Sequence, residues 1–179
     1  MHDIQYKRLE PSEIEPTKNL IREYVRWIGS DLSFQGIEEE VQHFPQKYEA
    51  PDGAFFVAVD GDVVVGCVGL KKIGDGICEM KRLYVKDAWK GRGIGKTLVN
   101  LIQREALKLG YRKMRLDTIT GLMPAAIALY ESEGFREIPA YVYNPIEGAT
   151  FLEKDLEENV NGKSELRIKE HMDTIDYNR

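Results

Sequence analysis

The segment from Trp89 to Thr97 reads WKGRGIGKT, a glycine-rich stretch that ends in lysine and threonine. A loop of this composition that runs into a helix presents backbone amides, and the helix N-terminus adds partial positive charge. Such amides bind anions, above all phosphates, and glycines let the ligand approach the backbone closely. The segment therefore predicts a site for a phosphate-bearing ligand.

Two familiar phosphate-binding motifs do not fit this segment. The P-loop of nucleotide triphosphatases requires its first glycine where this chain has Lys90. The dinucleotide fingerprint G-x-G-x-x-G requires, after Gly91 and Gly93, a third glycine where the chain has Lys96. A nucleotide-binding protein is therefore a weaker alternative, and other features have to identify the anion.

The overall composition bounds the class of protein. The chain has 179 residues, of which 42% are hydrophobic and 31% are charged, which is typical of one globular domain. Its formal net charge of -5 disfavours nucleic acid as a partner and mildly favours a cationic or neutral substrate. Because there is no long apolar run and no apolar signal segment, we expect a cytoplasmic protein with no membrane partner.

Cysteine and histidine do not form a recognisable site. Cys67 and Cys78 lie in apolar runs, which favours buried, reduced thiols over a disulfide. His2, His43 and His171 have neither metal-ligand spacing nor the partners of a hydrolytic triad. We therefore expect no metal site.

Hydrophobic periodicity and turn residues predict the elements that hold the glycine loop. Strands are expected at 4–9, 54–59, 63–72, 77–86, 113–119, 135–138 and 150–154. Helices are expected at 12–28, 37–47, 94–109 and 124–133, with Ser12 as the cap of the first and Gly29 as its end. The Glu38-Glu39-Glu40 run is expected to be a solvated helix face.

The connections between these elements predict an α/β fold of the α+β kind. Asp60-Gly61 and Asp75-Gly76 indicate hairpins, whereas the long helix between strands 77–86 and 113–119 requires a parallel crossover. The result is a mixed, mostly antiparallel sheet with one parallel pair. Residues 1–154 are expected to form a single domain, followed by a charged C-terminal helix or tail at 155–179.

Alternation along the strand at 77–86 predicts which side chains share a face. One face is expected to carry Glu79, Lys81, Leu83 and Val85, and the other Met80, Arg82 and Tyr84.

Two of these segments resemble the GNAT superfamily of acetyl-CoA-dependent N-acetyltransferases. The segments are CEMKRLYVKDAWKGRGIGKTL at 78–98 and ALYESEGF at 128–135, and the similarity extends over about residues 53–154. The resemblance implies helices on both faces of the sheet and a parallel strand pair that splays apart to admit a thioester. It also implies that the anion is the pyrophosphate of coenzyme A, so that acetyl-CoA is the co-substrate.

The cofactor-binding residues follow from the same resemblance. The family loop Gln/Arg-x-x-Gly-x-Gly/Ala falls on residues 90–95, where Lys90 departs from the usual first residue, and Met123 stands where many relatives carry asparagine. Amides from Arg92 to Lys96 are expected to bind the pyrophosphate, and the backbone from Leu83 to Val85 the pantetheine arm. The implied cofactor site is Leu83, Tyr84, Val85, Lys90, Gly91, Arg92, Gly93, Ile94, Gly95, Lys96 and Thr97.

Two residues match the catalytic positions of the family. Tyr130 matches the tyrosine that meets the sulfur, with packing on its helix as the alternative. Glu79 matches a carboxylate that some members use to accept the amine proton, usually through water. Its alternatives are electrostatic binding of the incoming cation and a salt bridge with Lys81 or Arg82.

The sequence says less about the site of the acceptor amine than about the cofactor site. Phe34, Tyr141 and Tyr143 lie in segments that could line an acceptor pocket, and ordinary packing explains them equally well. The resemblance implies direct transfer, in a ternary complex, of an acetyl group to a primary amine of a small molecule or of a protein. The alternative is a non-catalytic acyl-CoA-binding sensor, and a homodimer is compatible with the family.

Overall fold

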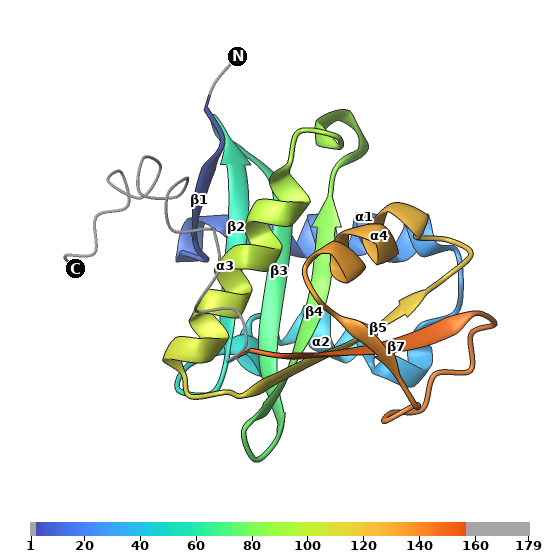
Figure 1. Cartoon of the computed structure of the whole chain (residues 1–179). Helices are drawn as coiled ribbons and strands as arrows, with labels where there is room; N and C mark the ends of the chain where they lie inside the picture. The colour runs from blue at the N-terminus through green and yellow to red at the C-terminus, as the bar shows by residue number, and fades with distance from the viewer. Residues whose placement is uncertain (1–2, 157–179) are drawn as a thin grey trace.

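The computed structural model describes residues 3–156, which form one seven-stranded sheet covered by helices on both faces (Figure 1). The strands are β1 (Gln5–Arg8), β2 (Ala54–Asp60), β3 (Val63–Gly74), β4 (Ile77–Val85), β5 (Lys113–Ile119), β6 (Arg136–Ile138) and β7 (Ala149–Asp155). The helices are α1 (Ile14–Ile28), α2 (Ile37–Gln42), α3 (Ile94–Lys108) and α4 (Pro124–Ser132). Short 3-10 turns occur at η1 (Pro11–Glu13), η2 (Ser33–Gln35), η3 (Gln46–Tyr48) and η4 (Asp87–Trp89).

The sheet has the order β1-β2-β3-β4-β5-β7-β6. Every neighbouring pair is antiparallel except β4–β5, which is parallel because α3 carries the chain back across the sheet. The predicted fold class, a mixed and mostly antiparallel sheet with one parallel pair, is therefore confirmed.

The two faces of the sheet pack against different helices. Apolar residues of α3 and α4, such as Leu98 and Ile102, form one core cluster with the sheet. Apolar residues of α1 and α2, such as Leu20 and Val41, form a second cluster on the opposite face. In Figure 1, α3 and α4 lie in front of the strands, whereas α1 and α2 lie behind them.

The first two helices differ from the prediction at their ends. Ser12 does not cap α1, because the chain first makes the turn η1, and the Glu13 carboxylate accepts a hydrogen bond from the Glu10 amide at 2.9 Å. Gly29 ends α1 in a left-handed conformation (φ 66°), as predicted. Helix α2 stops at Gln42 rather than continuing to 47, because Pro45 disfavours helical backbone before it and lacks an amide donor.

Strands β4 and β5 pair over only a short part of their length. The three residues Ile77–Glu79 pair with Lys113–Arg115, and beyond them the two strands diverge. The edge of β4 from Met80 to Val85 therefore has no neighbouring strand on the β5 side. This divergence is the splay that the family resemblance implied.

A β-bulge in β4 makes the predicted alternation wrong. Cys67 pairs with Tyr84 and Gly69 with Lys81, so a single residue of β3 opposes both Arg82 and Leu83. Arg82 has φ 59°, and it is the one non-glycine residue with a positive φ within residues 3–156. A bulge reverses the side-chain alternation after it.

The corrected faces of β4 follow from the packing. Met80, Leu83 and Val85 pack in the cluster with α3, and Tyr84 packs in the cluster with α1. Glu79 and Lys81 therefore share a face with Tyr84, not with Leu83 and Val85 as the alternation had predicted.

The prediction that the Glu38-Glu39-Glu40 run is solvated is wrong for its last member. Glu40 is 4% exposed, and its carboxylate accepts hydrogen bonds from Arg82 Nε at 2.8 Å and Arg82 Nη2 at 2.9 Å. Arg82 Nη1 also donates to Gln35 Oε1 at 2.9 Å. The bulge residue therefore links β4 to α2 and to the loop before it.

The last described residues of the chain belong to the folded core. Strand β7 continues to Asp155, and Leu156 is buried in the α3 cluster, so the folded core extends two residues past the predicted boundary at 154. The rest of the predicted charged helix or tail, residues 157–179, lies outside the described residues. Among residues 3–156 no helix is long and apolar enough to cross a membrane.

Candidate functional site

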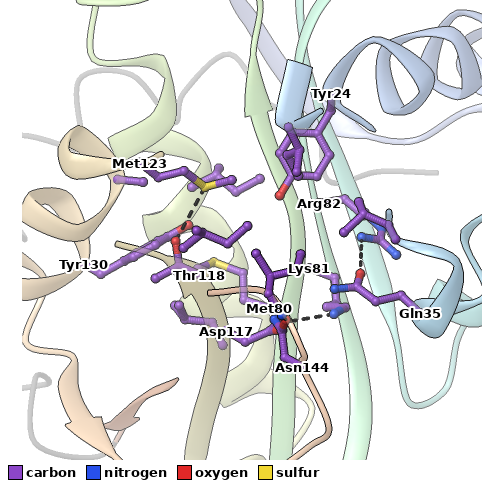
Figure 2. A pocket seen from close by; sticks show the side chains of 17 residues that line it. Tyr24, Gln35, Met80, Lys81, Arg82, Asp117, Thr118, Met123, Tyr130 and Asn144 are labelled. Carbon is purple, nitrogen blue, oxygen red and sulfur yellow. Dashed lines mark hydrogen bonds and ion pairs between the residues drawn. The ribbon is translucent and has the colours of Figure 1, made fainter. Parts of the chain in front are cut away.

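A cleft lies where β4 and β5 diverge (Figure 2). Its wall combines side chains from both faces of the sheet. They come from α1 and the segment after it (24–35), β4 (80–83), β5 (116–119), α4 and the residue before it (123–130) and the loop between β6 and β7 (144–146). A ligand in this cleft would therefore meet groups from both the α3–α4 face and the α1–α2 face.

The glycine loop ends in a helix start whose amides are not capped by a side chain. Gly91 (φ 76°) and Gly93 (φ 78°) have left-handed conformations, which glycine adopts without strain. Helix α3 begins at Ile94 with no side-chain cap, and its first intrahelical bond runs from Thr97 N to Gly93 O at 3.0 Å. The amides of Ile94, Gly95 and Lys96 are left to bind an anion.

This helix start lies against the other parts of the site. A Cβ added at Gly95 would lie 3.7 Å from Leu129 Cδ2 and 4.0 Å from Val85 Cγ2. The start of α3 is thus close to both the end of β4 and the helix that carries Tyr130.

Two basic side chains of the loop, those of Lys90 and Arg92, already have partners in the protein. Lys90 Nζ lies 2.5 Å from Asp87 Oδ1 and 4.7 Å from the centre of the Trp27 ring on α1. Arg92 Nη2 donates to the Ala88 carbonyl at 3.2 Å, and the Lys96 side chain is 65% exposed. Backbone amides, rather than the Lys90 side chain, are therefore the free donors of this loop.

Tyr130 projects from α4 into the cleft (Figure 2). It is 6% exposed and its ring packs edge-on against Phe135, with 5.8 Å between ring centroids. Burial, aided by the nearby Tyr24 and Asp117, raises the pKa of its hydroxyl above the ordinary value. The hydroxyl consequently stays protonated at neutral pH, as a hydrogen-bond donor must.

Glu79 is buried beside the cleft but is not part of its wall. Its Oε2 accepts a hydrogen bond from the Tyr141 hydroxyl at 2.7 Å. Its Oε1 lies 3.5 Å from Lys71 Nζ and 3.6 Å from Lys81 Nζ. Both carboxylate oxygens thus already have partners, including the Lys81 salt bridge that the sequence left open.

The three predicted acceptor aromatics lie next to the cleft rather than in its wall. Phe34 and Tyr143 meet edge to face at 6.1 Å between centroids, and Tyr143 is 76% exposed. Tyr141 packs on Phe151 at 5.6 Å, and burial together with Glu79 raises the pKa of its hydroxyl. The contact between Phe34 and Tyr143 joins η2 to the loop between β6 and β7.

Tyr24 and Asp117 are among the polar residues of the cleft wall that sequence reasoning missed. Tyr24 was counted among the apolar positions of the first helix, yet it contributes to the cleft wall opposite Tyr130 (Figure 2). Asp117 received no role, because in the alternating strand KMRLDTI it falls in the polar row with Lys113 and Arg115 and gives no signal of its own. The tertiary structure brings both to the splay.

Within residues 3–156 the cysteine, histidine and acidic side chains form neither a disulfide nor a metal site. Cys67 and Cys78 are free, buried thiols whose pKa burial raises to about 12. Across residues 3–156 no three histidine, cysteine, aspartate or glutamate side chains are grouped to hold a metal ion.

The sequence of this chain is similar to those of known proteins. The model of the acetyltransferase (GNAT) family matches residues 21–135. An uncharacterized N-acetyltransferase of Schizosaccharomyces pombe (strain 972 / ATCC 24843) is 38% identical over 148 residues, which cover 82% of this chain and 90% of that protein.

Two solved structures have a similar fold. A GNAT-family acetyltransferase from Staphylococcus aureus Mu50 superposes with a TM-score of 0.72 at 20% identity, over 86% of this chain and 99% of that one. The PaiA N-acetyltransferase of Thermoplasma acidophilum, solved in complex with coenzyme A, gives 0.66 at 22% identity over the same shares. The chain is an acyltransferase that belongs to the acetyltransferase (GNAT) family.

Proposed function

We propose that the protein transfers the acetyl group of acetyl-CoA to a primary amine of a small molecule, by direct attack in a ternary complex. The observation that carries the proposal is the uncapped start of α3 next to the splay of β4 and β5. An anion held there would direct an attached thioester arm into the cleft. The coenzyme A complex of the Thermoplasma relative supports this choice of anion.

The amides at the start of α3 would bind the pyrophosphate, and the unpaired edge of β4 would hold the arm. Beyond Glu79 the backbone of β4 has no strand partner on the β5 side, so its polar groups are available to a ligand. One amide near Leu83 would donate to the thioester oxygen, on which negative charge develops during attack. These donors are fixed before the ligand binds, which favours the transition state.

The hydroxyl of Tyr130 would donate a hydrogen bond to the departing sulfur. Because burial keeps this phenol protonated, it suits a donor role. Glu79 would act electrostatically on the acceptor side, through Lys81 and Tyr141, rather than by touching the amine.

Titration with acetyl-CoA, beside ATP and NAD, tests the cofactor. We expect saturable binding of acetyl-CoA alone, and then amine-dependent release of thiol in a panel of alkylamines, amino acids, polyamines and peptide N-termini. Binding without turnover of any amine would favour the acyl-CoA sensor. Binding of ATP or NAD in place of acetyl-CoA would overturn both readings.

Tyr130→Phe is expected to lower kcat roughly 10-fold while leaving the acetyl-CoA Kd unchanged. The effect is smaller than the roughly 100-fold or more typical of a general acid, because a thiol of pKa about 8.5 is already a good leaving group. Single-turnover thiol release measures it. An unchanged kcat would leave Tyr130 with a packing role only.

Glu79→Gln is expected to lower kcat/KM for the amine by roughly 10-fold at saturating acetyl-CoA, because the charge that shares Lys81 is lost. The acetyl-CoA Kd should stay the same. Wild-type turnover in this variant would show that Glu79 takes no part in the reaction.

A further inference from the structure

We infer that Asp117, on β5, is the carboxylate that receives the acceptor amine and its proton. The inference rests on the proposed function and assigns a catalytic residue that the sequence did not indicate. Three observations on the acceptor side of the cleft support it.

Asp117 is in contact with the space where the amine must arrive. It is the one carboxylate among the side chains of the cleft wall in residues 3–156. Glu79, which the family resemblance suggested, lies outside that wall. A proton acceptor must come within hydrogen-bond reach of the amine, directly or through one water. Asp117 meets this requirement better than Glu79 does.

The partners of Asp117 orient its carboxylate and hold one of its oxygens only loosely. Asn144 Nδ2 donates to Oδ2 at 2.9 Å, which fixes the plane of the carboxylate. Lys81 Nζ lies 3.4 Å from Oδ1 and 3.6 Å from Glu79 Oε1. Both distances exceed the roughly 2.7–2.9 Å of a charge-assisted hydrogen bond, so Lys81 is shared loosely between two carboxylates. Oδ1 can therefore accept a further donor, with Glu79 as the remaining partner of Lys81.

Asp117 also lies near the two tyrosines that face each other across the splay (Figure 2). Burial is the main cause that raises the pKa of Tyr24 and of Tyr130, and the charge of Asp117 raises both further. Neither hydroxyl has a hydrogen-bond partner within residues 3–156. A nitrogen bound between Asp117 and the thioester would have Tyr130 on the sulfur side.

The protons and bonds balance in this arrangement. The bound ammonium gives one proton to Asp117. Because a carboxylate is a far weaker base than an alkylamine, Asp117 does not keep this proton but passes it to water. The free amine then forms the C–N bond as the C–S bond breaks. The departing thiolate accepts a hydrogen bond from Tyr130, and the proton that leaves the new amide nitrogen converts it to the thiol. The products are the acetamide, the thiol and one proton released to water.

Asp117→Asn is expected to lower kcat/KM for the accepted amines of the panel by about 100-fold or more, with the acetyl-CoA Kd within about twofold of wild type. The loss should shrink as the pH rises towards the pKa of the amine, because free amine then needs no proton acceptor. If the variant lost kcat/KM only through a structural defect, the loss would not depend on the pKa of the amine. Glu153→Gln is the matched control, because Glu153 pairs with Lys113 and Arg115 in the same sheet but lies outside the cleft wall.

The losses of kcat/KM in Asp117→Asn and in Glu79→Gln, compared with each other, decide between the two carboxylates. A Glu79→Gln loss equal to or larger than that of Asp117→Asn overturns the inference, as does an Asp117→Asn rate within about threefold of wild type. If Asp117→Asn does not fold, Asp117→Glu replaces it. That variant keeps the charge beside Lys81 but displaces the carboxylate, so wild-type kcat/KM in it would also contradict the inference.

A wild-type protein that binds acetyl-CoA but acetylates no amine would instead refute the proposed function itself. The two failures are therefore distinguishable. Failure of the proposed function is seen in the wild type, whereas failure of the inference is seen only in the variants.

Discussion

Glu40→Gln is expected to lower the free energy of unfolding by about 3–5 kcal/mol, because it leaves a buried guanidinium without its counter-charge. Arg82 is 5% exposed, and two of its nitrogens bind the Glu40 carboxylate. Tyr48 also donates to that carboxylate at 2.7 Å, so the substitution disturbs several bonds at once. Urea denaturation, read as a shift in midpoint at constant slope, measures the loss.

The neighbouring Glu39→Gln is the control, because Glu39 is exposed on the same helix. Its effect should stay within about 0.5 kcal/mol. Equal stability of the two variants would mean that the buried pair contributes nothing beyond a surface glutamate.

The same pair predicts a dependence on pH. Burial alone would raise the pKa of Glu40, but the hydrogen bonds and charge of Arg82 outweigh it and lower the pKa to about 2. A carboxyl whose pKa is lower in the folded state stabilises the fold above the unfolded value of 4.5. That stabilisation, on the order of 3 kcal/mol, should disappear as the pH falls from about 4.5 towards 2. Glu40→Gln should therefore show a flatter stability curve in acid than the wild type.

Gly93→Val is expected to weaken acetyl-CoA binding at least about 10-fold. Gly93 has φ 78°, a conformation that costs other residues about 1–2 kcal/mol and β-branched residues more. A Cβ at this position would meet nothing within 4 Å, so the cost is in the backbone and not in a clash. The loop can relieve it only by turning, which moves the amides of Ile94 to Lys96 away from the pyrophosphate. Isothermal titration with acetyl-CoA measures the change.

Two matched substitutions test whether backbone strain or the added side chain weakens acetyl-CoA binding. Gly93→Asn should bind nearly as well as wild type, because asparagine tolerates the left-handed conformation. Gly95→Ala should also bind and fold, since its methyl group would make only ordinary contacts with Leu129 and Val85 and alanine favours a helix. Equal losses in Gly93→Val and Gly93→Asn would show that the side chain, not the backbone, is the cause.

The elements of this fold could be predicted because their signals are local. Hydrophobic period, turn dipeptides and the glycine loop act over a few residues, and they located the strands, the helices and the parallel crossover. The ends of α1 and α2 were less predictable, because the turn at Pro11–Glu13 competed with the Ser12 cap.

The faces of β4 could not be predicted, because a β-bulge depends on the partner strand. The alternation of KRLYV gives no indication that one residue of β3 opposes both Arg82 and Leu83. That extra residue moved Glu79 away from the face of Leu83 and Val85. The carboxylate in the cleft wall is instead Asp117, on the strand that diverges from β4.

By itself, the sequence determined the order of elements, the parallel pair and the glycine loop, because each depends on neighbouring residues and on backbone conformations that glycine and proline restrict. The tertiary structure alone decided which charges are buried together and which carboxylate borders the cleft. Arg82 and Glu40 are 42 residues apart, and Lys81 and Asp117 are 36 apart. Pairs at such separations form only when the whole sheet and its helices pack, so the charge pattern of either segment could not reveal them.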